Sequence, residues 1–209
     1  DAAYRELTYE GDPPPSIKRY DEGNRTVALL QTFSKPFSPG LKTGYALLPG
    51  DLVEPVLLQK GNHDFGSPNF NQHLLLAAMR SGAYARHVAE LRCRYAAKRD
   101  AMLAALEEHL GDFAAGQTHW TRPAGGLYVY LTLPETLDTG RGSELFRRAI
   151  DEGVLYVPGE YCHGPDPTRT VPRNTMRLSF GVPPEERIVE GIARLARAVR
   201  GAAAARESE

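Results

Sequence analysis

The feature of this 209-residue sequence that most constrains its fold is a long amphipathic stretch from Tyr84 to Leu110. Apolar residues recur along it at steps of mostly three and four, the spacing of one face of an α-helix. At ~1.5 Å per residue, such a helix spans roughly 40 Å, enough to bridge two lobes. We therefore expect one unit over residues 1–82 and a second over residues 83–209, made of this helix and a small α+β domain. The apolar positions are Tyr84, Val88, Leu91, Tyr95, Met102, Leu106 and Leu110.

The rest of the chain mixes short strands and helices. Runs rich in β-branched residues and leucine, bounded by turn residues, predict strands, and helical spacing with capping residues predicts helices. We expect Pro55 to lie in the first turn of the helix that begins near Asp51, where its missing N–H is tolerated. Gly201 is expected to end the last helix. The expected strands are 26–31, 43–48, 126–133, 154–157 and 176–180; the expected helices are 51 onward, 69–79, 143–152 with Ser143 as its cap, and 185–200.

Charge and composition argue against several classes of protein. Lysine and arginine total 25 against 26 acidic residues, which disfavours a nucleic-acid-binding surface. No apolar run approaches the ~20 residues that a membrane helix needs. The only cysteines, Cys93 and Cys162, are too few for a secreted disulfide scaffold. We therefore expect a cytoplasmic globular protein that binds neither nucleic acid nor membrane, and no metal site, because Cys/His clusters with ligand spacing are lacking.

The loop from Thr32 to Lys42 is the strongest candidate for chemistry. A predicted buried strand runs directly into this hydroxyl-rich segment, which carries Lys35 and Lys42 seven residues apart. Loops at strand ends are where α/β proteins place ligands. Hydroxyls and a cation suit a phosphate, and a lysine amine can form a Schiff base. On spacing alone, an ordinary solvated loop remains the alternative interpretation.

Five motifs, in order along nearly the whole chain, resemble those of class I/II aminotransferases, the fold-type I pyridoxal-phosphate enzymes. The nearest resemblance is to the 2-aminoadipate and aromatic aminotransferase-like subgroup. It implies an α/β fold: the rest of the large cofactor-binding domain in residues 1–82, then the linking helix and the small domain. The motifs are Asp1-Ala-Ala-Tyr4-Arg-Glu-Leu7, Ser34-Lys35 with Pro39-Gly40-Leu41-Lys42-x-Gly44-Tyr45, Pro123-Ala-Gly125-Gly126-Leu-Tyr128, Val157-Pro158-Gly159 and Arg177-Leu-Ser-Phe180.

The resemblance assigns roles around a pyridoxal 5'-phosphate cofactor. Lys35 would form the Schiff base and shuttle a proton at the substrate Cα. Asp1 would pair with the pyridine nitrogen and make the ring an electron sink. Tyr4 would hydrogen-bond the phenolic oxygen of the ring.

The resemblance also implies how phosphate and substrate are held. Thr32 and Ser34 would offer hydroxyls to the phosphate. Lys42 stands where the family usually has arginine, so a point charge would replace a bidentate fork there. Arg177 would clamp the α-carboxylate of amino acids and 2-oxo acids.

The function so implied is ping-pong transfer of an amino group between an amino acid and a 2-oxo acid. Two alternatives stay open: a lyase or decarboxylase on the same fold, and the effector domain of an aminotransferase-like transcription regulator. The family's phosphate loop, ring-stacking aromatic and asparagine belong to a preceding half that this sequence does not contain. We therefore expect a longer protein, a homodimer, and large exposed apolar faces in these 209 residues taken alone.

Overall fold

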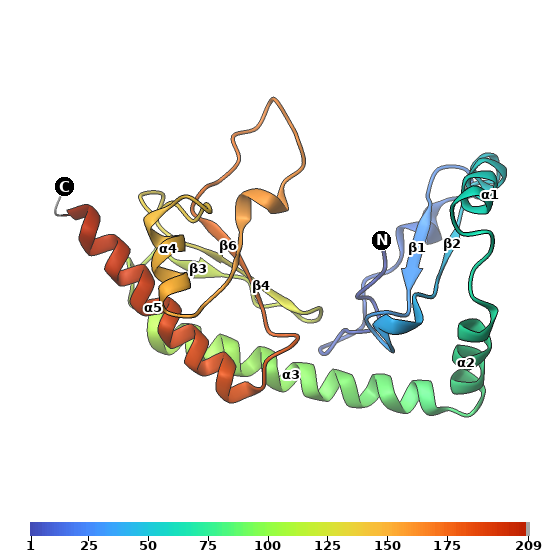
Figure 1. Cartoon of the computed structure of the whole chain (residues 1–209), viewed down its shortest axis with the longest axis horizontal. Coiled ribbons are helices and arrows are strands. Elements are labelled where there is room, and N and C mark those ends of the chain that lie inside the picture. The colour runs from blue at the N-terminus through green and yellow to red at the C-terminus, as the bar shows by residue number, and fades with distance from the viewer. Residues whose placement is uncertain (208–209) are drawn as a thin grey trace. The chain divides into compact units, whose positions relative to one another are not determined.

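The computed structural model describes residues 1–207, which divide into two compact units (Figure 1). One unit holds Asp1–Cys93 and Ala124–Gly126; the other holds Arg94–Pro123 and the chain from Leu127 onward. The predicted long helix is α3, Ala83–Leu110, and it contributes to both units. Since the division lies inside α3, the domain boundary after residue 82 stays a prediction.

The first unit is built on an antiparallel pair of strands. Strand β1, Leu29–Thr32, pairs with β2, Gly44–Leu47, so that Thr32 faces Gly44. Helices α1, Gly50–Asp64, and α2, Asn69–Arg80, follow. These elements confirm the strands and helices predicted in this region, with shifted ends. Short 3-10 helices at Ile17–Tyr20 and Pro39–Leu41 complete the unit.

The start of β1 is displaced because Asp21 holds the residues before it. The Asp21 carboxylate accepts hydrogen bonds from the backbone N–H groups of Arg25, Thr26 and Val27, each at 3.0 Å, and from Lys18 Nζ at 2.7 Å. The Lys18 hydrogen bond, with those backbone donors, holds the pKa of Asp21 well below its usual range. Residues 26–28 therefore belong to a side-chain-organised loop, and the strand predicted from residue 26 begins at Leu29.

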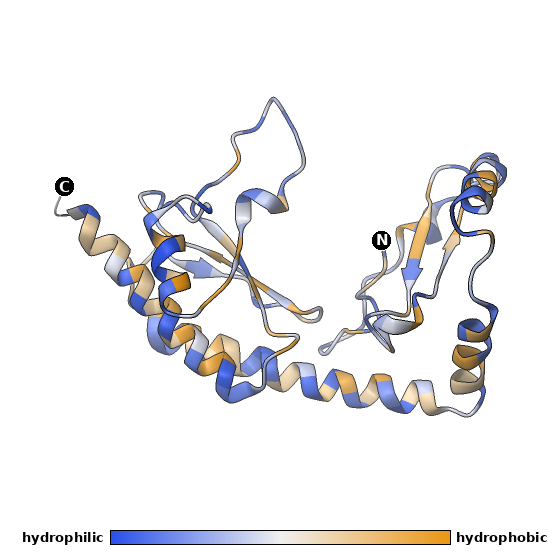
Figure 2. Ribbon diagram, viewed as in Figure 1, coloured by the Kyte–Doolittle hydropathy of each residue, from blue (hydrophilic) through white to orange (hydrophobic). Residues whose placement is uncertain are grey.

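Helix α1 differs from expectation in the position of its proline and agrees with expectation in its exposure. It begins at Gly50, so Pro55 is its sixth residue and lies beyond the first turn, which corrects our expectation. Pro55 has no N–H, so the Asp51 carbonyl loses its helical partner. In addition, α1 buries none of its residues, and Leu57 and Leu58 are 59% and 63% exposed. Figure 2 shows hydrophobic residues on α1, α2 and β1, and the expectation of large exposed apolar faces is confirmed.

The second unit is a four-stranded antiparallel sheet with helices. The strand order is β3-β4-β6-β5. One sheet face is apolar, with Val129, Leu131, Met176 and Leu178 at most 5% exposed. Figure 1 shows α5 and the C-terminal part of α3 on one side of the sheet. The elements are β3 His119–Trp120, β4 Tyr128–Thr132, α4 Glu144–Asp151, β5 Val157–Pro158, a 3-10 helix Gly159–Cys162, β6 Thr175–Ser179 and α5 Glu185–Glu207.

The ends of these elements follow from local and tertiary contacts. Ser143 caps α4 as predicted, its Oγ accepting from the Phe146 N–H at 3.1 Å. The predicted end of α5 at Gly201 is wrong, because the helix continues to Glu207. Val199 and Ala202, on either side of this glycine, are buried at 0% and 5% exposure. Their packing offsets the ~1 kcal/mol that a helical glycine costs. None of the described helices combines the length and apolar composition of a bilayer span.

Candidate functional site

Lys35 and Tyr4 are brought together in the first unit. The Lys35 Nζ lies 5.7 Å from the centroid of the Tyr4 ring, within the range of a cation–π interaction. The Ala2 N–H donates to the Leu30 carbonyl at 2.8 Å and so ties the N-terminal segment to β1. Because β1 leads into the lysine loop, this tie places the Asp1–Tyr4 motif beside the Ser34–Lys35 motif, 30 residues away in sequence.

Thr32 and Ser34 also lie together, at the turn that presents Lys35. Thr32 Oγ1 donates to Ser34 Oγ at 3.1 Å and accepts from the Ser34 N–H at 3.1 Å. The N–H groups of Phe37 and Ser38 both donate to the Phe33 carbonyl at 3.0 Å. These bonds close a tight turn around an exposed Lys35. The result is one amine and two adjacent hydroxyls on a single loop.

Lys42 ends the same loop in an unusual backbone conformation. It follows the 3-10 turn Pro39–Leu41 with φ 49° and ψ 37°, the left-handed region that few non-glycine residues adopt. Within residues 1–207 no hydrogen bond or ion pair engages its exposed ammonium group. The cation is therefore available to an anionic ligand. Among the described residues, no hydrogen bond joins Lys42 to Thr32 or Ser34.

Asp1 lies on the wall of a cavity in the first unit. Its Oδ1 accepts from the Ala3 N–H at 2.9 Å, and the side chain is exposed. Asp1 and Tyr4 line a cavity of about 690 Å³, whose wall also includes Lys18 and the Gly125–Gly126 pair. Lys35 is not among its lining residues. Tyr4 is thus the residue that the Asp1 cavity and the Lys35 contact share.

The glycine pair acts as a backbone clamp on the N-terminal segment. The Gly126 N–H donates to the Leu7 carbonyl at 2.9 Å, and Thr8 and Gly125 form an isolated antiparallel bridge. A Cβ on Gly125 would stand 2.5 Å from the Leu7 carbonyl oxygen, so only glycine permits this approach. The motif was recognised from sequence, but its partner, the strand-like residues after Tyr4, was not.

Tyr84, hydrogen-bonded to Glu6, belongs to the apolar cluster on which the lysine loop packs. Sequence reasoning missed this pair. Tyr84 Oη donates to Glu6 Oε2 at 2.6 Å. Burial, followed by this hydrogen bond, raises the pKa of Tyr84 above its usual value. Phe33, Phe37 and Leu41 of the lysine loop pack against the cluster that contains Tyr84. No local spacing signals a contact between residues 78 positions apart.

Arg177 lies in the second unit, on the polar face of β6. It is partly buried, and its cross-strand neighbours are Tyr130 on β4 and Val157 on β5. Its guanidinium carbon stands 4.4 Å from the centroid of the Tyr128 ring. Within the described residues, no hydrogen bond or ion pair engages this guanidinium. Tyr128 is the last residue of the glycine-pair motif, but sequence reasoning gave it no role and did not predict its contact with Arg177.

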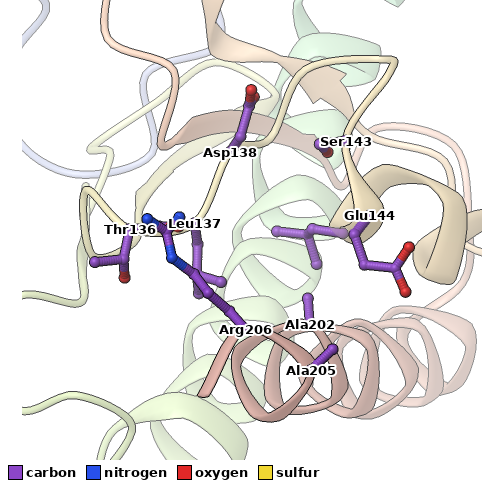
Figure 3. A pocket seen from close by; sticks show the side chains of 9 residues that line it. Thr136, Leu137, Asp138, Ser143, Glu144, Ala202, Ala205 and Arg206 are labelled. Atoms are coloured by element: carbon purple, nitrogen blue, oxygen red, sulfur yellow. The ribbon is translucent and has the colours of Figure 1, made fainter. Parts of the chain in front are cut away.

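A separate cavity in the second unit contains none of the predicted site residues. It measures about 450 Å³ and lies between α5 and the segment that leads into α4 (Figure 3). Its charged side chains have partners: Arg206 donates to the Thr136 carbonyl, Asp138 pairs with Arg173, and Glu144 pairs with Arg147. Because the charged groups of this cavity already have protein partners, and none of the predicted site residues lines it, it is a weaker candidate than the lysine loop.

Comparison with known proteins identifies similar sequences and folds. The family model described as aminotransferase class I and II matches residues 1–195. The chain is 38% identical over 202 residues to aromatic-amino-acid aminotransferase 1 of Thermococcus litoralis, covering 96% of this chain and 45% of that protein. It superposes on the alpha-aminoadipate aminotransferase LysN of Thermus thermophilus, solved with N-(5'-phosphopyridoxyl)-L-leucine. That match has a TM-score of 0.81 and 33% identity, and covers 97% of this chain and 49% of LysN.

A second kind of relative also matches. The uncharacterised HTH-type transcriptional regulator YisV of Bacillus subtilis is 34% identical over 181 residues, covering 86% of this chain and 34% of the regulator. The chain spans about half the length of the curated aminotransferases it matches. Both the enzymes and the regulators are thus longer than the sequence described here.

Proposed function

The chain belongs to the class I and II aminotransferase family, and on this basis we propose that its protein transfers amino groups between an amino acid and a 2-oxo acid. The observation that carries the proposal is the Lys35–Tyr4 pair, in which a primary amine lies over a phenol ring. The same turn carries the hydroxyls of Thr32 and Ser34. Ping-pong kinetics follow, because one site must bind donor and acceptor in turn.

The donor set of the first unit fits pyridoxal 5'-phosphate. An aldehyde needs a primary amine, a pyridine nitrogen needs a carboxylate, and a phosphate needs hydroxyls and a cation. Lys35 would supply the amine and Asp1 the carboxylate. Tyr4 would donate a hydrogen bond to the phenolic oxygen of the cofactor. The chemistry that this cofactor supplies when bound is an electron sink next to the substrate Cα.

The anion-binding groups have separate tasks. Thr32, Ser34 and Lys42 would hold the phosphate, with Lys42 as the point charge. Arg177 would bind the substrate α-carboxylate through paired N–H donors. Lys35 would take the Cα proton, which requires its amine to be released from the cofactor in neutral form.

Completion of the site rests on segments outside these 207 described residues. The bare α1 helix and the half-length match to the relatives support a preceding half that covers this surface. We propose a homodimer for the whole protein, as the family resemblance implies. The cytoplasmic location inferred from the few cysteines stays a prediction.

A second candidate function is that of a regulator's effector domain, and it is supported by a specific match. The match to a helix-turn-helix regulator supports an effector domain that binds the cofactor or an amino acid without turnover. A basic DNA-binding domain in the preceding sequence would favour it. A lyase or decarboxylase reaction on the same residues is the nearest enzymatic alternative, since reaction choice depends on which bond at Cα breaks.

The test uses the whole protein with the cofactor bound. Borohydride reduction followed by peptide mapping should place the pyridoxyl label on Lys35. A label on Lys42, or no label, contradicts the assignment. An amino-donor screen with 2-oxoglutarate then separates the functions: glutamate formation supports the aminotransferase. Release of ammonia or CO₂ favours a lyase or decarboxylase, and a label without turnover favours the regulator.

A further inference from the structure

The polar face of the second unit's sheet groups aromatic rings around one arginine. Residues directly opposite in an antiparallel pair point to the same face. The register pairs Tyr130 with Arg177 and Tyr128 with Ser179, so Tyr128, Tyr130 and Arg177 share this face. The alternate residues of β4 and β6 are buried on the other face.

Arg177 is held differently from other arginines of the same unit. Arg173 pairs with Asp138 at 3.0 Å, Arg197 with Glu152 at 2.7 Å and Arg200 with Asp112 at 2.7 Å. In each case a carboxylate occupies guanidinium N–H donors. The contact recorded for the Arg177 guanidinium is the Tyr128 ring, 4.4 Å away, and no described carboxylate reaches it.

This difference decides which part of the guanidinium is free. The five N–H donors of arginine lie in the plane of the group and point outward from its edge. A cation positioned over an aromatic face is attracted by the ring quadrupole and needs none of those donors. A ring can therefore fix the position of the arginine and leave its fork open, whereas a carboxylate would compete for it.

We propose that Tyr128 is the positioning residue for Arg177, its ring holding the guanidinium so that the N–H fork meets the α-carboxylate of the substrate. The inference rests on the carboxylate-binding role of Arg177 in the proposed function. A pre-positioned fork loses less side-chain entropy on binding than a free arginine side chain. The substrates so favoured are those with a carboxylate on the reacting carbon.

Tyr130 provides a matched contrast on the same strand and face. Its hydroxyl donates to Thr175 Oγ1 at 2.9 Å and lies 3.4 Å from His163 Nε2. Tyr130 is thus tied to the start of β6 and to the loop after β5. Removing its hydroxyl tests the general integrity of this face without touching the ring on Arg177.

The experiment compares Tyr128→Leu, Tyr128→Phe and Tyr130→Phe in the whole protein with cofactor. Tyr128→Leu should raise KM for every amino acid and 2-oxo acid by roughly three- to thirtyfold, the range expected for a lost cation–π contact. The kcat should change less than KM. Tyr128→Phe keeps the ring and should have the KM of the parent. Tyr130→Phe should also leave KM unchanged.

A second readout separates this inference from the proposed function. In ¹H–¹⁵N spectra, the Arg177 Nε–H resonance should shift in Tyr128→Leu and stay in Tyr128→Phe, because the ring current is lost only in the first. Titration with 2-oxoglutarate should move that resonance, with weaker affinity in Tyr128→Leu. If this holds while no donor is turned over, the positioning role stands and transamination fails. An Arg177 signal that ignores saturating 2-oxoglutarate, or equal KM in Tyr128→Leu and the parent, overturns the positioning role.

Discussion

Gly159 approaches Thr175 so closely that a Cβ on Gly159 would stand 1.9 Å from Thr175 Oγ1 and 2.6 Å from Tyr130 Oη. The Val157-Pro158-Gly159 motif is therefore a packing requirement, because it lets the chain after β5 lie against the strand that carries Arg177. Gly159 itself is buried.

Gly159→Ala should lower the free energy of unfolding by ~1–3 kcal/mol, since the collision partners are themselves fixed by a hydrogen bond. Denaturant titration of both proteins measures the change. Gly164→Ala is the matched control, because nothing lies within 4 Å of its added Cβ. Equal losses in the two variants would show that the crowding at Gly159 has no energetic role.

Lys42→Ala should weaken retention of the cofactor by about tenfold or more, because a charge-assisted bond to the phosphate is lost. Lys42→Arg should restore or improve retention, since the guanidinium fork matches phosphate geometry. Dialysis against phosphate buffer, followed by cofactor absorbance, measures this. Lys60→Ala serves as control, since Lys60 is a partly exposed lysine of α1 paired with Asp64. Full retention by Lys42→Ala would remove Lys42 from the phosphate site.

Arg177→Ala should raise KM for every amino acid and 2-oxo acid while cofactor absorbance survives. Loss of a bidentate carboxylate contact is worth roughly 2–4 kcal/mol, or about thirtyfold and more in KM. Arg177→Lys should fall between, because it keeps the charge and loses the fork. Steady-state kinetics with two donors and two acceptors measure the effect. A rise in KM for one substrate alone would point to a side-chain pocket and away from the shared carboxylate.

Tyr84→Phe should lower the free energy of unfolding by about 1 kcal/mol, because the hydrogen bond to Glu6 is removed. Tyr20→Phe, on a residue 69% exposed, should change it by less than ~0.5 kcal/mol. These values are measured by denaturant titration at neutral pH.

The raised pKa of Tyr84 also gives the parent an alkaline signature. The unfolded chain loses this proton near the ordinary tyrosine pKa of about 10, while the folded protein retains it to higher pH. The contribution of Tyr84 is therefore fully present below pH ~10 and is lost as the pH rises further. Thermal unfolding across pH 8–11 should show a shallower decline in Tyr84→Phe than in the parent. An identical decline would mean that Tyr84 titrates alike in both states.

Much of the fold was predictable because its signals are local. The three- and four-residue spacing of α3 and the Ser143 cap of α4 depend on neighbours within one or two turns, and both predictions are confirmed. The exceptions have long-range causes. Packing of Val199 and Ala202 stabilises α5 beyond Gly201. The Asp21 carboxylate binds the backbone of residues that were predicted to begin the first strand, so these residues form a loop.

The candidate site divides in the same way. By itself, the sequence determined the lysine loop, because Thr32, Ser34, Lys35 and Lys42 lie within eleven consecutive residues of one loop. Only the tertiary structure decided which distant groups hold those residues: Tyr4 under Lys35, Tyr84 on Glu6, and Tyr128 on Arg177. The physical reason is range. Backbone hydrogen bonding and side-chain periodicity act between near neighbours, so they can be predicted from the order of residues. Ring and carboxylate contacts depend on where packed strands and helices bring remote residues.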